Sequence, residues 1–231
     1  MRVRAITFDL DDTLWPIAPA MLNAEQRLDD WLRTHCPRSA VAYPVAAMRV
    51  LRDRVAADNP HLAHDFTAQR RLSLQTALLA HGYDDGHVDA AFSAFYAARN
   101  EVQCYADARP ALQQLAARYP LAAITNGNAD LDAIGLNHLF RFCLYASDFG
   151  AAKPAPEIFH AACARLGLPP EAVLHVGDDP ELDVAGAHAA GMRCVWLNRG
   201  SAKPAPAATP DLIVSDLAEL AKALGQFSAA A

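Results

Sequence analysis

The 231-residue sequence predicts an α/β fold: a doubly wound, Rossmann-like parallel sheet with an inserted helical-bundle domain. Short apolar runs bounded by turn residues recur along the chain, which is typical of parallel strands buried on both faces. Helical patterns alternate with the later runs, as in β-α-β units. Hydrophobic residues make up 53% and charged residues 20% of the chain. The whole chain is therefore expected to fold around a sizeable core.

Six apolar runs are the expected strands, at residues 3–8, 121–125, 143–147, 173–176, 194–197 and 212–214. Helical patterns lie between them, at residues 109–118, 129–136, 156–166 and 180–190. Asn, Gly and Pro mark the boundaries, because these residues form turns and end helices. In an open sheet of this kind, ligands bind in the crevice at the carboxyl ends of the strands.

One long segment breaks the alternation of strands and helices. Residues 16–107 contain no convincing strand and show four amphipathic helical segments, at residues 20–34, 45–57, 66–81 and 86–100. Pro and Gly separate these segments, because the fixed φ of Pro and the left-handed tolerance of Gly end helices. The predicted division is an α/β catalytic core at residues 1–15 and 108–231, with a helical cap at residues 16–107.

Charge and cysteine usage narrow the expected partners. The formal net charge is −6, and Lys and Arg are scattered along the chain, so no nucleic-acid polymer is expected. The five cysteines are widely spaced and form no C-x-x-C pair, which favours a reducing compartment. No apolar run reaches the length of a membrane span, and no signal-like segment opens the chain. A cytoplasmic monomer without a membrane partner is the expectation.

Polar residues follow the apolar runs where the carboxyl edge of the sheet is expected. They are Asp9, Asp11, Asp12 and Thr13 after the first run, Thr125-Asn126-Gly127 at the second, Lys153 after the third, and Gly177-Asp178-Asp179 with Asp183 after the fourth. Carboxylates gathered at one edge repel one another and are costly to desolvate unless a cation neutralises them. Ligands that are all oxygen suit a hard ion, so the cluster predicts Mg²⁺.

These motifs together resemble those of the haloacid dehalogenase superfamily. Its four signatures occur here in order, as Asp9-x-Asp11-x-Thr13, Thr125, Lys153 and Gly177-Asp178-Asp179 with Asp183. Each motif is weak alone, but four in order at strand ends form a strong joint signal. The resemblance is to the phosphatase branch with a helical, type C1, cap, which would close over the site and set specificity.

The resemblance implies a role for each motif residue. Asp9 would attack phosphorus to form an aspartyl-phosphate, and Asp11 would be the general acid and base. Thr125, Asn126, Gly127 and Lys153 would bind the phosphate group. Asp9, the backbone carbonyl of Asp11, and Asp178 would hold Mg²⁺, with Asp179 and Asp183 behind them and Asp183 bonded to Lys153. From the residues alone, Asp9 could also be only a metal ligand, and Thr125 only a strand-end cap.

The expected activity is hydrolysis of a phosphomonoester on a small metabolite such as a nucleotide, flavin mononucleotide or a sugar phosphate. Asp11 argues against dehalogenation, because a departing halide needs no proton and the dehalogenase branch replaces this acid. A sugar phosphomutase would share the aspartyl-phosphate. A phospho-accepting receiver-like module also uses clustered aspartates, a Thr and a Lys, but the helical insertion and Asp11 argue against it.

Other residues have plainer expectations. The insertion holds arginines that could meet a second phosphate or a polar substrate, although helix arginines usually face solvent; they are Arg49, Arg52, Arg54, Arg70 and Arg71. His175 lies in an apolar run and is expected to be a hydrogen-bonded core residue without a catalytic role. Trp15 is expected to pack beside the first motif.

Overall fold

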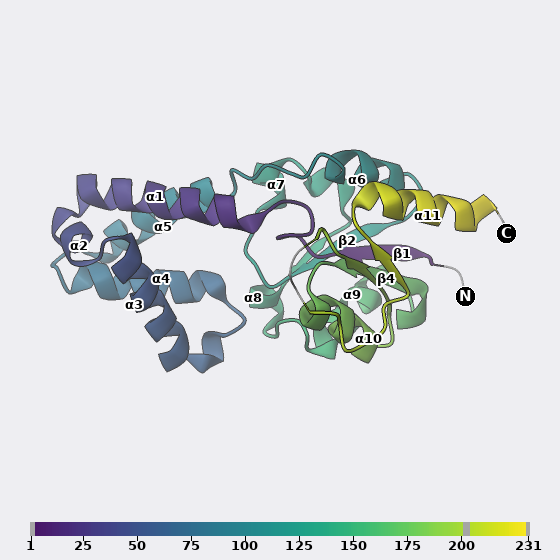
Figure 1. Ribbon diagram of the computed structural model, residues 1–231. Helices are drawn as coiled ribbons and strands as arrows, with labels where there is room; N and C mark the ends of the chain where they lie inside the picture. Colours follow the sequence, from purple (N-terminus) through teal and green to yellow (C-terminus); the bar gives the residue numbers. More distant parts are fainter. Residues whose placement is uncertain (1–2, 201–203, 230–231) are drawn as a thin grey trace. The chain divides into compact units, whose positions relative to one another are not determined.

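The computed structural model describes residues 3–200 and 204–229 (Figure 1). The chain divides into two compact units. The first, here called the sheet unit, spans Met1–Pro16, Gln103–Gly127 and Leu131–Ala231. The second, here called the helical unit, spans Ile17–Val102 and Asn128–Asp130. Each unit has its own buried cluster of hydrophobic side chains.

Within the described residues, the sheet unit holds one six-stranded sheet. Its strands are β1 (Ala5–Phe8), β2 (Leu121–Thr125), β3 (Cys143–Tyr145), β4 (Val173–Gly177), β5 (Arg193–Leu197) and β6 (Leu212–Val214). The strand order is β3-β2-β1-β4-β5-β6, and every neighbouring pair is parallel. This is the doubly wound order: successive strands are added outward from β1 to β3 on one side, and then from β4 to β6 on the other side of β1. The predicted α/β, Rossmann-like fold class is confirmed.

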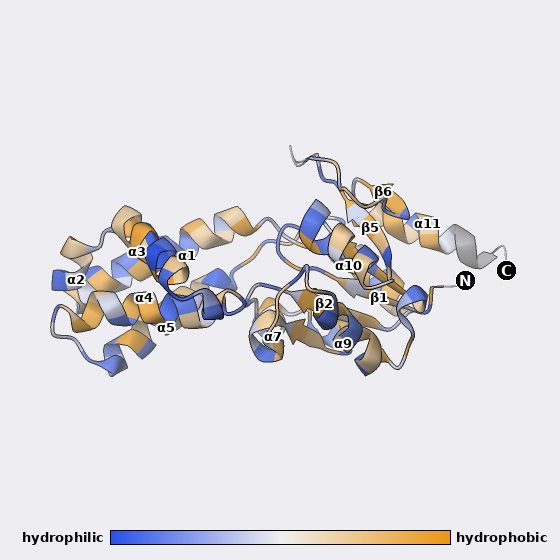
Figure 2. Cartoon of the chain, turned by 90° about the horizontal axis from the view of Figure 1, so that it is seen from below, coloured by the Kyte–Doolittle hydropathy of each residue, from blue (hydrophilic) through white to orange (hydrophobic). Residues whose placement is uncertain are grey.

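Helices cover both faces of the sheet. Figure 1 shows α6 (Ala108–Ala116) and α11 (Leu217–Ala229) on one face, and α9 (Pro156–Leu166) and α10 (Gly186–Ala189) on the other. Shorter segments complete the unit: α7 (Leu131–Ile134), η2 (Asn137–Leu139), α8 (Ala146–Phe149), η3 (Pro170–Ala172) and the π-helical η4 (Pro180–Ala185). Every residue of β1, β2 and β4 is buried. Figure 2 shows the hydrophobic colouring around β1 and β2. Two covered faces explain why the strands are continuous apolar runs.

The helical unit is built from α1 (Ile17–His35), α2 (Pro37–Ala42), α3 (Val45–Asp58), η1 (Pro60–Leu62), α4 (Phe66–Leu79) and α5 (Asp85–Arg99). Asp65 and Asp84 cap α4 and α5, because their side chains accept the backbone N–H groups of Ala68 and His87. The sequence did not predict α2, since Pro37 looked like a stop. Pro37 instead occupies the first turn of α2, where its missing N–H costs nothing.

A segment distant in sequence also belongs to the helical unit. Residues 128–130 follow the loop after β2, and their polar groups bond within this unit. The side chain of Asn128 donates to Oγ1 of Thr67 (3.0 Å) and accepts from Nε of Arg99 (3.1 Å). The backbone N–H of Asp130 donates to the side chain of Asn100 (2.8 Å). Hydrophobic periodicity does not reveal such pairings, so the predicted insertion at residues 16–107 lacks this segment.

No helix in the described part of the chain combines the length and apolar character that a membrane span requires.

Candidate active site

Three carboxylates meet at the carboxyl edge of the sheet unit. Asp9 follows β1, Asp178 follows β4, and Asp183 lies in η4, and one oxygen of each lies within 4.8 Å of the others. β1 and β4 are neighbours with Phe8 opposite Val176, so the residues that follow them are adjacent. All three side chains are buried. Of the predicted site residues, these are the carboxylates that the fold brings together.

Lys153 supplies the positive charge of this cluster. Its Nζ donates to Oδ1 of Asp9 (2.6 Å) and to Oδ1 of Asp183 (2.5 Å). Only 4% of the residue is exposed. The side chain of Asn126 holds its backbone, donating to the carbonyl of Lys153 (3.0 Å) and accepting from its N–H (2.8 Å). Asn126 therefore ties the loop after β2 to the lysine.

The charges in this cluster do not balance. Lys153 pairs with two of the three buried carboxyl groups, and when all three are ionised two negative charges are left without a protein cation among these four residues. Burial, reinforced by Asp183 and Asp178 and opposed by Lys153, raises the pKa of Asp9 to about 8. Burial also works against the ionised form of Asp183, but Lys153 and His175 hold its pKa below the usual range. A site whose ligands are all oxygen atoms, and whose ionised carboxylates carry two negative charges that no protein cation balances, fits a divalent cation.

The first motif forms a tight turn. Asp12 has φ of 61°, in the left-handed region that Asp tolerates better than most residues. The N–H of Asp12 donates to the carbonyl of Trp15 (2.7 Å), and the N–H of Leu14 donates to the carbonyl of Leu10 (2.8 Å). The indole Nε1 of buried Trp15 donates to Oδ1 of Asp11 (2.8 Å). Trp15 packs as expected, and it also orients Asp11.

Asp178 is held in place from two sides. Oγ1 of Thr13 donates to its Oδ1 (3.2 Å), and Nε1 of Trp196 donates to its backbone carbonyl (3.1 Å). Thr13 and Trp196 are both buried. The hydrogen bond from Thr13 links the first motif directly to the fourth.

Asp179 turns away from the cluster to cap η4. Its Oδ1 accepts the backbone N–H groups of Glu181 and Leu182, each at 2.9 Å. Its own N–H donates to Oδ2 of Asp183 (2.9 Å). Asp179 therefore contributes to the site by starting the π-helical turn that carries Asp183.

Thr125 ends β2 and shapes the loop that follows. The residue is 1% exposed, and its Oγ1 accepts the backbone N–H of Gly127 (2.9 Å). The Thr125-Asn126-Gly127 loop is thus fixed by one bond within it and by the bonds of Asn126 to Lys153. Phosphate binding by this loop stays a prediction.

Two buried residues behind the cluster had no predicted role in the site. Nδ1 of His175 lies 2.9 Å from Oγ1 of Thr7, and its Nε2 lies 3.2 Å from Oδ1 of Asp183. His175 is a hydrogen-bonded core residue, as its sequence context predicted. Polar residues at positions 7 and 175, facing each other in paired strands, were the signal available in the sequence.

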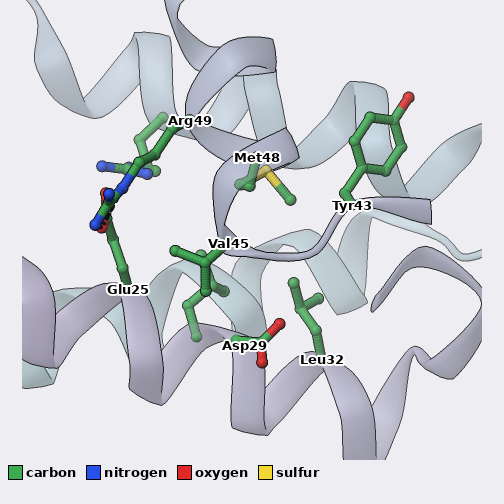
Figure 3. Close-up of a pocket in the computed structure, with 9 residues that line it drawn as sticks. Glu25, Asp29, Leu32, Tyr43, Val45, Met48 and Arg49 are labelled. Atoms are coloured by element: carbon green, nitrogen blue, oxygen red, sulfur yellow. Dashed lines mark hydrogen bonds and ion pairs between the residues drawn. The ribbon is translucent and has the colours of Figure 1, made fainter. Parts of the chain in front are cut away.

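Most arginines named as possible substrate contacts in the helical unit have carboxylate partners there. Arg49 donates to Oε2 of Glu25 from Nε (2.8 Å) and Nη2 (2.5 Å), at one edge of a pocket drawn in Figure 3. Arg52 bonds Asp53 (2.9 Å), and Arg71 pairs with Asp89. The buried guanidinium of Arg70 lies 4.1 Å from the ring centroid of Phe95.

The buried pair of Asp9 and Lys153 lies at the carboxyl edge of a doubly wound sheet, where enzymes of this fold class place their active sites. Residues 3–191 match the family model of the haloacid dehalogenase-like hydrolases. The chain belongs to this family.

Two relatives with a large shared length are named as phosphatases. A 5-amino-6-(5-phospho-D-ribitylamino)uracil phosphatase of Escherichia coli is 34% identical over 85% of this chain and 84% of its own. A ribulose-1,5-bisphosphate 5-phosphatase of Halopiger xanaduensis is 30% identical over 84% of each chain. These relatives agree with the phosphatase branch that the motifs predict.

Several similar solved structures are named as dehalogenases. The crystal structure of a 2-haloacid dehalogenase from Pseudomonas syringae is 39% identical and covers 97% of this chain and 99% of its own, with a TM-score of 0.90. The fold therefore agrees closely with that protein, and the choice of leaving group rests on the site residues.

Proposed function

We propose that the protein is a Mg²⁺-dependent phosphomonoesterase that works through an aspartyl-phosphate on Asp9. The observation that carries this proposal is the buried Asp9 carboxylate, 2.6 Å from Nζ of Lys153, with a second acid, Asp11, two residues further along the chain. Lys153 orients the nucleophile and faces the charge of the transferring group. Asp11 supplies the proton that an ester leaving group needs.

The reaction has two steps. In the first, an oxygen of Asp9 forms a bond to phosphorus while the bond from phosphorus to the ester oxygen breaks, and Asp11 protonates that oxygen. In the second, Asp11 takes a proton from water, the water oxygen bonds to phosphorus, and the bond to Asp9 breaks. Trp15 keeps Asp11 oriented through its indole N–H. Thr125 and Asn126 would donate to the phosphate oxygens, and Gly127, whose N–H bonds Oγ1 of Thr125, would complete the loop that binds the phosphate group.

Asp9, the backbone carbonyl of Asp11, and Asp178 would hold the Mg²⁺ ion, with Asp179 and Asp183 supporting them. Bound there, the ion would neutralise the remaining carboxylate charge and polarise the phosphoryl group. The unbalanced negative charge of the three carboxylates around Lys153 supports a divalent cation at this site.

The substrate class is a small phosphorylated metabolite. The names of the relatives support this class, since they include phosphatases of a phosphorylated ribitylaminouracil, of phosphoserine and of glyceraldehyde 3-phosphate. In this proposal the helical unit is the cap that selects among such esters. A monomeric state and a cytoplasmic location stay predictions from the sequence.

The test is phosphate release from nucleotides, sugar phosphates, flavin mononucleotide and phosphoserine, with Mg²⁺ and with EDTA. We expect repeated turnover of at least one ester that stops with EDTA. Asp9→Asn should lose at least about 10³-fold in kcat while its circular dichroism stays that of the wild type. Wild-type turnover by Asp9→Asn would refute the proposed nucleophile. A single phosphorylation without turnover would indicate a receiver-like module, and transfer back to a sugar would indicate a mutase.

Dehalogenation is the second candidate, because of the similarity to the Pseudomonas syringae structure. Asp11 favours phosphate esters, since halide departs without a proton. Chloride release from 2-chloropropionate, measured beside the ester panel, separates the two. We expect no chloride above the Asp9→Asn background.

A further inference from the structure

We propose that His175 is a positioning residue, which holds Asp183 and through it the ammonium group of Lys153 against Asp9. The kinetic test of this inference rests on the proposed function, whereas its NMR test does not. The histidine touches neither Asp9 nor Lys153 by any recorded bond, so its effect passes through Asp183.

The surroundings of His175 leave its ring one orientation. The residue is fully buried in β4, and the ring of Phe159 packs edge-on against it, with centroids 5.0 Å apart. Its two nitrogens lie in hydrogen-bond contact with Thr7 on β1 and with Asp183 in η4. Three elements therefore fix the ring.

The proton arrangement follows from the partners. A carboxylate only accepts hydrogen bonds, so the Nε2 that faces Asp183 must carry a proton. This holds whether the imidazole is neutral or charged. In the neutral ring Nδ1 is then an acceptor, and the hydroxyl of Thr7 donates to it. Asp183 thereby selects the tautomer with a proton on Nε2, and the hydroxyl of Thr7 matches it by donating to Nδ1.

Asp183 needs this support because it carries several bonds at a crowded place. Its Oδ1 receives Lys153 and His175, and its Oδ2 receives the N–H of Asp179. Its carboxyl group lies against Gly177, where an added Cβ would come within 2.2 Å of it. Without His175, Oδ1 of Asp183 keeps Lys153 as its one partner among these bonds, and the carboxyl group is held less firmly in the position that receives the ammonium group.

The kinetic test compares two substitutions of His175. His175→Phe keeps a ring but removes the N–H, and a hydrogen bond to a charged group of about 1.5–3 kcal/mol corresponds to about 10- to 100-fold. We expect that loss in kcat with KM unchanged within about threefold. His175→Gln places an amide N–H near the former Nε2 and should recover most of kcat. Wild-type kcat in His175→Phe, or an effect confined to KM, would overturn the proposal.

Phe159→Leu is the matched control for packing. It removes the edge-on ring contact and keeps both hydrogen bonds that hold the ring of His175, so the melting temperature should fall while kcat stays within about twofold of the wild type. If Phe159→Leu loses kcat as His175→Phe does, His175 acts through stability alone, and the positioning role is wrong.

A spectroscopic readout does not depend on turnover. Two-dimensional NMR of ¹⁵N-histidine-labelled protein, with His175 assigned from the missing signal in His175→Gln, should show the Nε2–H tautomer. Thr7→Val should shift the Nδ1 resonance. An Nδ1–H tautomer in the wild type would refute the proposed arrangement. If the wild type hydrolyses no ester, the proposed function fails, while the tautomer result still decides the arrangement of His175.

Discussion

Trp15 shows how one residue serves both packing and chemistry. Its side chain is fully buried, and its Nε1 donates to Oδ1 of Asp11 at 2.8 Å. Trp15→Phe keeps most of the buried area and removes the donor, so we expect kcat to fall by about 10-fold or more, as for the loss of a hydrogen bond to a charged group. Steady-state kinetics on the best ester measures this. Trp31→Phe in α1 is the control and should leave kcat unchanged; equal kinetics in both variants would contradict the role of Trp15.

Gly177 must be a glycine because the side chain of Asp183 lies against it, and not because of its own backbone angles. A Cβ built there would lie 2.2 Å from Cγ of Asp183, so Gly177→Ala must displace the carboxyl group that holds Lys153. We expect loss of at least about 2 kcal/mol of unfolding free energy, in the range of overpacked core sites, together with most of the activity. Urea denaturation and ester hydrolysis measure the two effects.

Gly225→Ala in α11 is the matched control for Gly177→Ala. There the nearest heavy atom to an added Cβ is 3.6 Å away, an ordinary contact. Ala is the better helix former, so stability should rise by up to about 1 kcal/mol. A Gly177→Ala protein as stable and active as Gly225→Ala would show that Asp183 can move without consequence.

At the scale of elements, Asp107 joins three parts of the sheet unit. It lies directly before α6 and accepts the N–H of Leu217 at the start of α11 (2.8 Å). Its carboxylate also receives both terminal nitrogens of Arg199, at 3.0 and 2.8 Å, and Arg199 donates to the carbonyl of Thr13 in the first motif (3.1 Å). One carboxylate thus secures a helix start and, through Arg199, the turn that carries Asp11.

Asp107→Ala should therefore cost more than a surface charge. The substitution removes the acceptor for the N–H of Leu217, and it leaves the guanidinium of Arg199 half-buried without its carboxylate. We therefore expect the unfolding free energy to fall by about 2–3 kcal/mol. Urea denaturation measures it. Glu157→Ala, an exposed residue in the first turn of α9, should change stability by less than about 0.5 kcal/mol. If the two variants lose similar unfolding free energy, the hydrogen bonds of Asp107 do not stabilise the sheet unit.

At the scale of the whole molecule, Mg²⁺ should stabilise the fold in a pH-dependent way. In the metal-free protein the pKa of Asp9 is raised to about 8, above its ordinary value of 3.8. Between those values the folded state holds a proton that the unfolded state has lost, so this group's contribution to stability falls as pH rises. The cation must displace that proton, and its binding strengthens as pH rises toward 8.

Melting temperatures with Mg²⁺ and with EDTA, each at about pH 5.5 and about pH 8, test this expectation through their difference. The difference between the two melting temperatures cancels the titrating groups that the metal does not affect. We expect the increment to be larger at the higher pH, and about 2.7 kcal/mol when Mg²⁺ exceeds its Kd 100-fold. The Asp9→Asn protein should lose this pH dependence; an equal increment at both pH values would contradict the raised pKa.

Much of the fold was predictable from local patterns. The expected strands at residues 121–125 and 212–214 and the expected helix at residues 156–166 coincide with β2, β6 and α9. Buried parallel strands must be apolar, and Pro and Gly end segments through their own backbone limits. Local patterns failed where a residue is compatible with two structures, as at Pro37, which can end one helix or start the next and here starts α2. The helix expected at residues 180–190 begins with the π-helical η4.

By itself, the sequence determined the fold class, the strands and the motif residues at their ends, because periodicity and turn chemistry depend only on neighbouring positions. Tertiary structure alone decided which side chains bond: Trp15 with Asp11, Asn126 with the backbone of Lys153, His175 with Asp183, and Glu25 with Arg49. The partners of the site lie far apart in the sequence: Asp9 and Lys153 are separated by 144 positions, and Thr13 and Asp178 by 165. A hydrogen bond depends on distance and direction in space, and those exist only once the chain has folded.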